Sequence, residues 1–408
     1  MRIAVIGSGV AGLSAAYVLA RTCDVTLFEA DDRLGGHAHT HDVGGLAVDS
    51  GFIVHNDQTY PLLSRLFREL SVETRTAEMS MSVRCRGCGL EYAGGRGPRG
   101  LLARPPGIRY LRMLAGVPRF HRAARALLDD PAGADPTLGE FVTGYSPYFV
   151  AHFVTPLVAA VWSCSPADAT RYPARHLFAF LANHGMLAVT GAPQWRTVAG
   201  GSRSYVERVA KQLTSVQTGT PVRELRRTPA GVALYAGTRP REGARPLEFD
   251  AAVVATHPDQ ALRLLAAPTW AERETLGAFR YSRNEAVLHT DGSALPEHAR
   301  ASWNYTMPSC TATADRVRVS YDMNRLQRLD AERPHVVTLG GTVAEEHVLA
   351  RMVYEHPVFT PESVAAQARL PTLNDARIVF AGAYHGWGFH EDGCRAGVEA
   401  ARALGGAW

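Results

Sequence analysis

The chain opens with a strand, a glycine-rich turn and a helix, and this order constrains its fold more than any other feature. The apolar run 3–6 leads into Gly7-Ser8-Gly9-Val10-Ala11-Gly12, and residues 13–20 are typical of a helix. In such a unit Gly7 allows a tight turn, Gly9 lets a pyrophosphate approach the backbone, and Gly12 lets helix and strand pack closely. The helix N-terminus presents unpaired N–H groups and the positive end of its dipole to phosphates. The sequence therefore predicts a dinucleotide-binding α/β domain.

A second predicted strand, residues 25–28, ends in an acid. Glu29 follows the third glycine, Gly12, by 17 residues. A carboxylate at the end of this strand can accept both hydrogen bonds of a ribose diol, whereas a 2′-phosphate calls for an arginine. Glu29 therefore disfavours NADP at this site.

The residues after Glu29 carry a resemblance to a known family. The run Ala30-Asp31-Asp32-Arg33-Leu34-Gly35-Gly36 continues from the acid into Arg-x-Gly-Gly, and Val48-Asp49-Ser50-Gly51-Phe52 comes next. In both runs the chain resembles the flavin-containing amine oxidase and phytoene desaturase superfamily. The resemblance implies non-covalent FAD, with Arg33, Gly35 and Gly36 along its pyrophosphate and ribityl chain. It also implies that Gly51 and Phe52 lie beside the isoalloxazine ring.

The same resemblance recurs in the middle of the chain and near its end. Residues 200–201, Val222 and the strand 250–257 resemble the middle segment of the superfamily, and a strand over 377–384 precedes a helix over 394–404. The superfamily closes its FAD site with such a strand and helix, whose dipole stabilises the anionic reduced flavin. The residues assigned to FAD are Gly7, Gly9, Val10, Ala11, Gly12, Glu29, Ala30, Arg33, Gly35, Gly36, Gly51, Phe52, Val222, Ala255, Gly382, Ala383, Phe389, His390 and Glu391.

One short motif narrows the resemblance. Gly388-Phe389-His390-Glu391-Asp392-Gly393 is similar to the closing motif of a bacterial NAD/FAD-binding branch associated with cyclopropane-fatty-acid-synthase-like methyltransferases. The resemblance implies a substrate that is a lipid acyl chain or another long apolar molecule. The expected reaction is hydride removal from a C–H bond, either as desaturation or as flavin-mediated double-bond isomerisation. Because the chain has one glycine fingerprint, the electrons would pass to O2, a quinone or a partner protein.

The alternatives are a flavin amine oxidase, an oxidase that tailors a secondary metabolite, and a non-catalytic flavin-binding partner of a methyltransferase. In flavin amine oxidases a lysine commonly holds a water against flavin N5. Lys211 is the one lysine of this chain, and it falls where the family does not place that residue. The lysine position counts against the amine oxidase alternative.

The predicted fold class is α/β, with a Rossmann-like FAD domain of the glutathione-reductase type interleaved with an α+β substrate domain. We expect the FAD domain to comprise residues 1–55, 195–265 and 370–408, and the substrate domain residues 56–194 and 266–369. Periodicity predicts helices and strands in the two insertions. The predicted helices are 62–70, 120–128, 148–161 and 175–187, the hairpin is 79–92, and the strands are 285–289, 302–307, 316–321 and 335–340.

Candidate catalytic and pocket residues come from the segments expected beside the flavin. A histidine has a pKa near neutrality, which suits proton transfer during C–H cleavage. His390 is the first choice because the family motif places it at the flavin edge, with His385 and Tyr384 as further candidates. His55-Asn56 supplies another possible acid–base pair. The predicted substrate pocket consists of Trp162, Trp195, Asn183, His184 and Trp387.

Composition excludes several functions. The formal net charge is +4 over 408 residues, and no motif of a common nucleic-acid module occurs, so nucleic acid is not an expected partner. No apolar run reaches the roughly 18 residues that span a bilayer. Six scattered cysteines fit a reducing cytoplasm. Cys85-Arg86-Gly87-Cys88 has no second cysteine pair with which to bind zinc, so we expect no metal site. The two cysteines either form a redox disulfide or flank the tip of a hairpin.

One segment has an unusual charge pattern. Residues 96–125 contain eight arginines, interleaved with apolar residues, and no acid occurs between Glu91 and Asp129. An arginine-rich amphipathic segment can lie on an anionic membrane surface, although a solvated helix face explains the same pattern. The sequence thus predicts a cytoplasmic protein with possible peripheral contact at the inner face of the membrane through 96–125.

Overall fold

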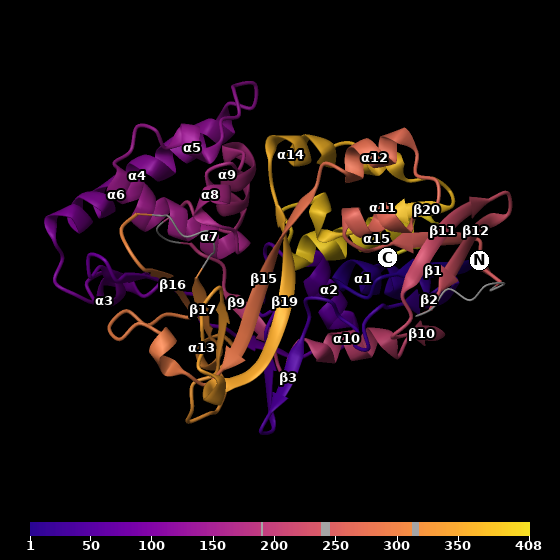
Figure 1. The fold of residues 1–408 in the computed structure, drawn as a ribbon, viewed down its shortest axis with the longest axis horizontal. Helices are drawn as coiled ribbons and strands as arrows, with labels where there is room; N and C mark the ends of the chain where they lie inside the picture. The colour runs from indigo at the N-terminus through magenta and orange to yellow at the C-terminus, as the bar shows by residue number, and fades with distance from the viewer. Residues whose placement is uncertain (189–190, 238–244, 312–317) are drawn as a thin grey trace.

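The computed structural model describes residues 1–188, 191–237, 245–311 and 318–408. Figure 1 shows one half built on a parallel sheet, which carries both termini, and another half built from an antiparallel sheet and helices. The long strands β15 (Arg280–His289) and β19 (Val348–Val358) run between these halves (Figure 1). This architecture confirms the predicted fold class.

The parallel-sheet domain is built on five strands in the order β10 (Ser215–Gln217), β2 (Asp24–Phe28), β1 (Arg2–Ile6), β14 (Ala251–Val254) and β20 (Ile378–Phe380). The apolar runs of the three strands β1, β14 and β20 are buried on both faces, as parallel strands require. Because side chains alternate along a strand, Ile3 and Val5 face one layer while Ala4 and Ile6 face the other. The first layer contains α1 (Val10–Leu19), α2 (Pro61–Glu69), α10 (Arg203–Ala210) and α15 (His390–Ala403).

The second layer of this domain combines a small sheet with short helices. It contains the antiparallel strands β11 (Val222–Thr228), β12 (Gly231–Ala236) and β13 (Leu247–Phe249) and the helices α11 (Pro258–Leu264), α12 (Trp270–Leu276) and α14 (Pro361–Gln367). There are two further small sheets. One is the hairpin of β3 (Thr40–Val43) and β4 (Leu46–Asp49), and the other has the strand order β5 (His55–Asn56), β9 (Trp195–Val198) and β6 (Thr74–Thr76).

The antiparallel-sheet domain has seven strands. Their order is β19, β15, β18 (Val336–Leu339), β17 (Val319–Asp322), β16 (Trp303–Met307), β7 (Met81–Cys85) and β8 (Glu91–Gly94). The predicted hairpin 79–92 is therefore present as β7 and β8. Strand β16 pairs in parallel with β7, which sets Met307 opposite Cys85. The sequence reading missed β19, and the first residues of the predicted strand 316–321 lie outside the described part of the chain.

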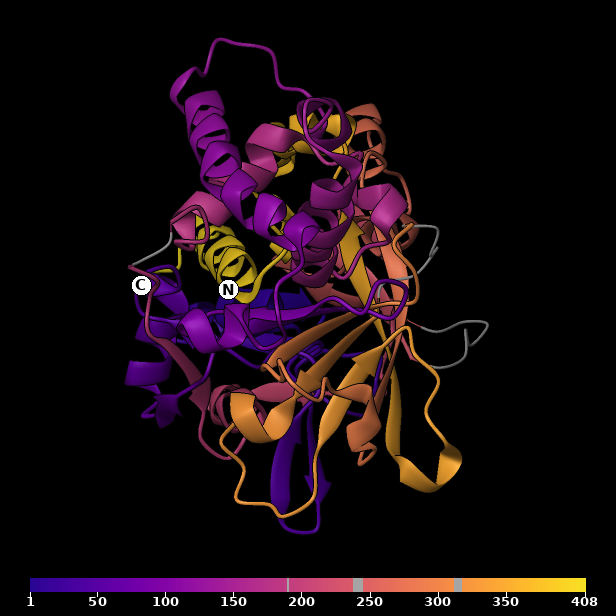
Figure 2. The ribbon, with the colours of Figure 1, turned by 90° about the vertical axis from the view of Figure 1, so that its left-hand side faces the viewer.

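Helices cover this sheet (Figure 2), and a dense aromatic core lies among them. The ring of Phe120, on α4 (Ile108–Asp129), lies within 6 Å of the rings of five other aromatic residues. Helix α4 begins 12 residues before the predicted start at 120. The predicted helix 175–187 is α9 (Ala174–Asn183), which ends before Gly185, where φ is +69°. The other helices here are α3 (Gly97–Leu101), α5 (Leu138–Phe141), α6 (Pro147–Phe149), α7 (Thr155–Trp162), α8 (Pro166–Ala169) and α13 (Met323–Leu326).

The packing revises one predicted domain boundary. Residues 60–79 were expected in the substrate domain, but Leu63, Leu66 and Phe67 of α2 are buried in the core of the parallel-sheet domain. Their apolar face packs against α15, so the amphipathic pattern marks burial without saying which core receives it. Within the described ranges, no helix combines the length and apolar character needed to cross a bilayer.

Candidate active site

The first glycine turn forms an open backbone cradle at the start of α1. Gly7 has a φ of +98°, and a Cβ there would lie 2.9 Å from the carbonyl oxygen of Ala255. A Cβ on Gly12 would collide with the carbonyl of Gly7, whereas nothing lies within 4 Å of the corresponding position on Gly9. Helix α1 begins at Val10 without a side-chain cap at Gly9, which leaves its first N–H groups available. This cradle fits a pyrophosphate.

The acid at the end of β2 lies beside the cradle. Glu29 Oε2 accepts hydrogen bonds from the backbone N–H of Ser8 at 2.9 Å and from its hydroxyl at 2.5 Å. Its Oε1 accepts the Asp31 N–H at 3.0 Å. The backbone N–H of Thr220 donates to the carbonyl of Glu29, which draws the segment before Val222 alongside. The carboxylate is therefore held where a ribose bound to this cradle would meet it.

The Arg33 to Gly36 loop closes over the cradle. The backbone N–H of Gly35 donates to the Ser8 carbonyl and hydroxyl, both at 3.1 Å. A Cβ on Gly36 would lie 3.1 Å from the Cα of Gly9, so the two backbones are in direct contact. On the far side of the loop, the N–H of Phe52 donates to the His37 carbonyl at 2.7 Å. The segments that the sequence assigned to FAD thus meet around Gly9.

The N-terminus of α15 converges on the same place. A Cβ on Gly393 would lie 2.6 Å from a methyl group of Val10, and a Cβ on Gly397 would overlap the Ala11 carbonyl. Close packing of α1 on α15 therefore depends on these glycines. It sets two helix N-termini side by side, which together favour an anionic group. Ala383, in the turn before α15, lies 3.7 Å from the Gly393 position.

The two acids in the first turn of α15 are engaged within the protein. Glu391 accepts the N–H groups of Leu62 and Leu63 at the start of α2, each at 3.0 Å. Burial raises the pKa of Glu391 to about 7 despite these bonds. Asp392 accepts the N–H groups of Trp387 and Phe389 at 3.0 Å, and Arg395 donates to its other oxygen at 2.8 Å. The Glu391 carboxylate therefore caps the start of α2, and the expected contact of Glu391 with the cofactor stays a prediction.

Three of the candidate acid–base residues lie in or near α15, where Tyr384 is buried and His385 and His390 are half-buried. His390 stacks on Phe52 with ring centroids 3.8 Å apart, and its Nε2 lies 3.1 Å from the Tyr205 hydroxyl. Burial lowers the pKa of His390 to about 3, so its ring is uncharged at neutral pH. The Tyr384 ring packs against Phe279, and burial lowers the pKa of His385 to about 4. The catalytic roles of His390, His385 and Tyr384 remain predictions. The contacts of these side chains count against such roles.

Four of the five predicted pocket residues form one aromatic wall. Trp162 donates from its indole N–H to the Trp387 carbonyl at 3.2 Å and lies 4.8 Å from Phe180. Phe180 stacks on Phe389 at 4.4 Å and on His184 at 4.0 Å. His184 in turn stacks on Trp195 with centroids 6.1 Å apart. We define the aromatic wall as Trp162, Phe180, His184, Trp195, Trp387 and Phe389. Asn183, the last residue of α9, is exposed and is not part of this wall.

A histidine cluster beside the cradle was not singled out from the sequence. The His37 ring lies 5.1 Å from Tyr354 and 5.4 Å from His356, both on β19. Burial, and then the neighbouring His356, lowers the pKa of His37 well below its ordinary value. Burial also lowers the pKa of His356 to about 4. The cluster escaped notice because β19 itself was missed, although Tyr354 and His356 alternate along it as residues of one strand face do.

Comparisons with known proteins agree with this geometry. Residues 10–405 match the model of the family described as flavin containing amine oxidoreductase. Over 188 residues the chain is 31% identical to a coproporphyrinogen III oxidase of Mycobacterium leprae. That match covers 40% of this chain and 38% of the relative, so it spans less than half of the relative's length.

Solved structures share the fold across nearly the whole chain. Cyclohexylamine oxidase from Brevibacterium oxydans IH-35A has a TM-score of 0.71 at 16% identity and covers 99% of this chain and 98% of its own. A CLA-producing fatty acid isomerase from P. acnes has a TM-score of 0.70 at 14% identity, with 98% and 97% covered. Since the family match covers nearly the whole chain, including helix α1, the Arg33 to Gly36 loop and α15, the chain belongs to the flavin-containing amine oxidoreductase family and is an FAD-dependent oxidoreductase.

Proposed function

We propose that the protein removes a hydride from a C–H bond of a long apolar substrate such as an acyl chain, by desaturation or by double-bond isomerisation. The aromatic wall is the observation that carries this proposal. It extends from the helical layer to the turn before α15, where Trp387 and Phe389 are half-buried, and aromatic faces of this kind suit an extended hydrocarbon. The resemblance of residues 388–393 to the closing motif of the lipid-associated branch supports the same substrate class.

The state of the nearby acids favours an apolar substrate over an amine. An ammonium group bound in a buried pocket needs a carboxylate or a comparable partner. Glu391 and Asp392 lie closest to the wall in sequence, and both already accept hydrogen bonds from helix or turn N–H groups. Lys211 is exposed at the C-terminal end of α10, which removes it from the lysine role of amine oxidases.

Bound FAD would accept the hydride at its N5 atom. The residues of this chain would position the two reactants: the backbone around Gly9 holds the pyrophosphate non-covalently, and the aromatic wall orients the substrate and excludes water. In a desaturation the accompanying proton must leave from the neighbouring carbon of the substrate, whereas an isomerisation by hydride removal and return loses no proton. The electrons would then pass to O2, a quinone or a partner protein, or the hydride would return to the chain in an isomerisation.

His184 is the residue of the wall best placed to receive that proton. Its Nδ1 lies 3.0 Å from the Phe180 carbonyl, and since a carbonyl can only accept, Nδ1 carries the hydrogen. The lone pair is then on Nε2. Burial lowers the pKa of His184, which keeps the ring neutral and able to accept a proton at pH 7.

We also propose that residues 96–125 touch an anionic membrane surface on the cytoplasmic side. Leu102, Ile108 and Leu111 are 55%, 63% and 44% exposed on this segment. Exposed arginines stand around them: Arg99, Arg104, Arg109 and Arg112. Apolar side chains beside arginines suit the boundary between head groups and acyl chains. An acyl substrate could then reach the wall from the bilayer.

The test is anaerobic mixing of the FAD-loaded protein with membrane lipid extract from its source organism. Loss of the visible flavin band with a lipid short of two hydrogens supports desaturation, and an unbleached flavin with a rearranged double bond supports isomerisation. Bleaching by amines or by coproporphyrinogen III, with no change in lipid, contradicts the acyl-chain proposal. A flavin that no lipid bleaches, in a protein that forms a stable complex with a methyltransferase, indicates a non-catalytic partner.

A further inference from the structure

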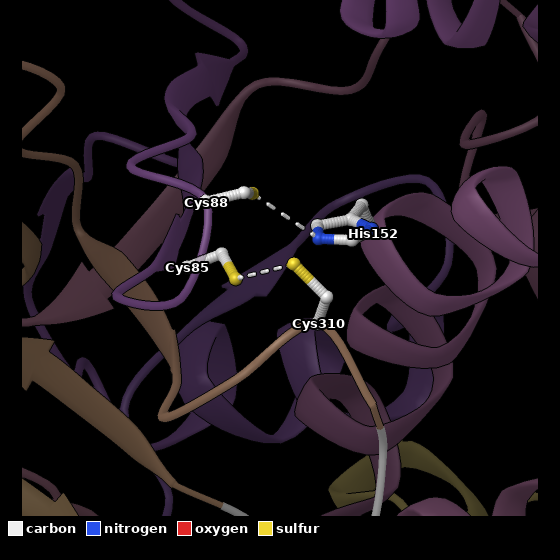
Figure 3. A group of neighbouring side chains, drawn as sticks. All are labelled: Cys85, Cys88, His152 and Cys310. Carbon is white, nitrogen blue, oxygen red and sulfur yellow. Dashed lines mark hydrogen bonds between the residues drawn. The ribbon is translucent and has the colours of Figure 1, made fainter.

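We propose that Cys85, Cys88, His152 and Cys310 form a structural zinc site in the antiparallel-sheet domain. One ligand atom from each of the four residues lies within 4.8 Å of the others. Figure 3 shows the four side chains directed toward one another from three separate segments. Three thiolates and one imidazole are a common donor set for structural zinc. This proposal is independent of the substrate and of the flavin chemistry.

The hairpin tip between β7 and β8 supplies the first two ligands. Cys85 ends β7, and the backbone N–H groups of Gly87 and Cys88 donate to its sulfur. The N–H of Leu90 donates to the sulfur of Cys88. Such N–H···S bonds offset negative charge on thiolates, which is the form that binds a metal. Gly89, with φ of +70°, provides the turn that directs the Leu90 N–H inward.

His152 is oriented as a metal ligand. It lies in the π-helical turn Val150–Val154, a local widening that is frequent at functional sites. Its Nδ1 lies 3.0 Å from the Tyr148 carbonyl, so Nδ1 carries the hydrogen and Nε2 carries the lone pair. That Nε2 faces Cys88, 3.6 Å from its sulfur. The Tyr148 ring stacks on the imidazole at 4.0 Å and fixes its plane.

Cys310 arrives from the loop after β16. The parallel pairing of β16 with β7 ends with Met307 opposite Cys85, and the Arg86 N–H donates to the Met307 carbonyl at 2.9 Å. A Cβ on Gly87 would lie 3.0 Å from the Cα of Ser309 and 3.1 Å from the nitrogen of Cys310. The glycine of the Cys-x-x-Cys turn therefore lets this loop approach the hairpin tip. The approach brings the Cys310 sulfur to 3.8 Å from that of Cys85.

These separations fit a tetrahedron around one ion. With Zn–S bonds of about 2.3 Å and a Zn–N bond of about 2.0 Å, tetrahedral geometry sets sulfur atoms about 3.8 Å apart and sulfur and nitrogen about 3.5 Å apart. The observed values are 3.8 Å between Cys85 and Cys310 and 3.6 Å between Cys88 and His152. A closed set of four protein ligands leaves no position for substrate, which indicates a structural role. The ion would join the sheet hairpin to the helical layer.

Sequence spacing pointed away from this site, since the Cys-x-x-Cys has no second pair. The missing ligands are single residues, His152 at 64 positions from Cys88 and Cys310 at 225 from Cys85. Neither spacing belongs to a recognisable zinc motif. The proposal therefore replaces the earlier expectation that the cysteines only flank a turn.

The first experiment is elemental analysis of the FAD-loaded protein purified under reducing conditions without chelator, with X-ray absorption at the zinc edge. We expect about one zinc per chain, bound by three sulfur ligands and one nitrogen. Cys88→Ser and His152→Ala should lose most of the zinc and lower the melting temperature. Cys23→Ser, which alters a cysteine outside the cluster, should retain it.

A second measurement covers the case in which these variants fail to fold. Titration of the unmodified protein with a mercurial thiol reagent should release the zinc to a colorimetric chelator as the cluster thiols react, while FAD stays bound. The proposal is overturned if the purified protein holds no zinc and takes up none when Zn²⁺ is added. It is also overturned if peptide mass spectrometry finds Cys85 or Cys88 in a disulfide under these reducing conditions.

Discussion

Asp49 and Ser202 are joined by three hydrogen bonds. The backbone N–H of Ser202 donates to both carboxylate oxygens of Asp49, at 2.9 and 3.1 Å, and its hydroxyl donates to Oδ1 at 2.8 Å. Gln327 of the antiparallel-sheet domain donates to Oδ2 at 2.9 Å. Asp49 therefore connects the end of β4, the start of α10 and the other domain. Burial raises its pKa to about 6, which shows the desolvation that these bonds offset.

Removing this carboxylate should be costly. Asp49→Ala would leave the donors of Ser202 and Gln327 buried without an acceptor, and we expect a loss of about 3 kcal/mol in the free energy of unfolding. Asp42→Asn is the matched control on the same hairpin, because it removes an exposed ion pair with Arg203 and should cost less than about 0.5 kcal/mol. Urea unfolding followed by circular dichroism measures both. Equal stability of the two variants would contradict the connecting role of Asp49.

Stability should fall in mild acid. Burial lowers the pKa of several histidines, so they stay neutral in the folded chain while the unfolded chain gains protons below about pH 6.5. Their contribution is present above pH 6.5 and is lost as pH falls toward the folded pKa. These residues are His55, His176, His356 and His385 at about 4, and His39 and His390 at about 3. His55 alone corresponds to about 3 kcal/mol.

The raised carboxyl pKa values of Glu391 and Asp49 act in the opposite direction, since those groups stay protonated on folding up to about pH 7 and 6. The histidines outnumber them, so we expect a lower melting temperature at pH 5 than at pH 7. His55→Gln should reduce this difference, and His298→Gln, at an exposed position, should not. A melting temperature that is the same at pH 5 and at pH 7 would contradict this prediction.

The glycine cradle predicts a specific loss of cofactor. In Gly12→Ala the new Cβ would meet the Gly7 carbonyl, which forces α1 away from the turn that holds the pyrophosphate. We expect purified Gly12→Ala to contain less than a tenth of the FAD of the unmodified protein. Gly107→Ala is the control, because Gly107 has an ordinary φ of −77° and open space at its Cβ position. Full FAD content in Gly12→Ala would show that the turn does not bind the cofactor.

His184 can be tested as the proton acceptor. His184→Gln keeps a side chain of similar size but removes a basic nitrogen, and we expect flavin bleaching by the substrate to slow about 100-fold while FAD binding is retained. Anaerobic stopped-flow absorbance measures this rate, with the lipid that the anaerobic mixing test identifies as substrate. His298→Gln serves again as the exposed control. An unchanged rate in His184→Gln would assign the proton to solvent or to another residue.

Membrane contact predicts a surface-specific effect. Ile108→Glu and Leu111→Glu place a negative charge among the arginines of residues 96–125, and we expect sedimentation with anionic phospholipid vesicles to fall about tenfold. Leu349→Glu is the matched control, because Leu349 is similarly exposed at 42% but lies on β19. If all three variants bind vesicles alike, residues 96–125 are a solvated face.

The sequence alone determined the cofactor and its cradle. The strand, the spacing of Gly7, Gly9 and Gly12 and the acid at 29 are local, and each has a geometric requirement that few other residues satisfy. The aromatic wall was also partly accessible, because its tryptophans lie in segments that the resemblance set near the flavin. Asn183 shows the limit of that reasoning. It is adjacent to His184 in the sequence, but at the end of α9 His184 is buried and Asn183 is exposed.

Tertiary structure decided what depends on distant segments. Residues 60–79 are amphipathic, but only packing against α15 showed which core receives them. His390 and Glu391 belong to one motif, but only the fold showed that His390 contacts Phe52 and Tyr205 and that Glu391 caps α2. His152 and Cys310 reach Cys85 and Cys88 through strand pairing and a helix turn, not through spacing. A motif in a short run of sequence can be recognised before the fold is known. A site whose residues come singly from distant segments can be recognised only once the chain has folded.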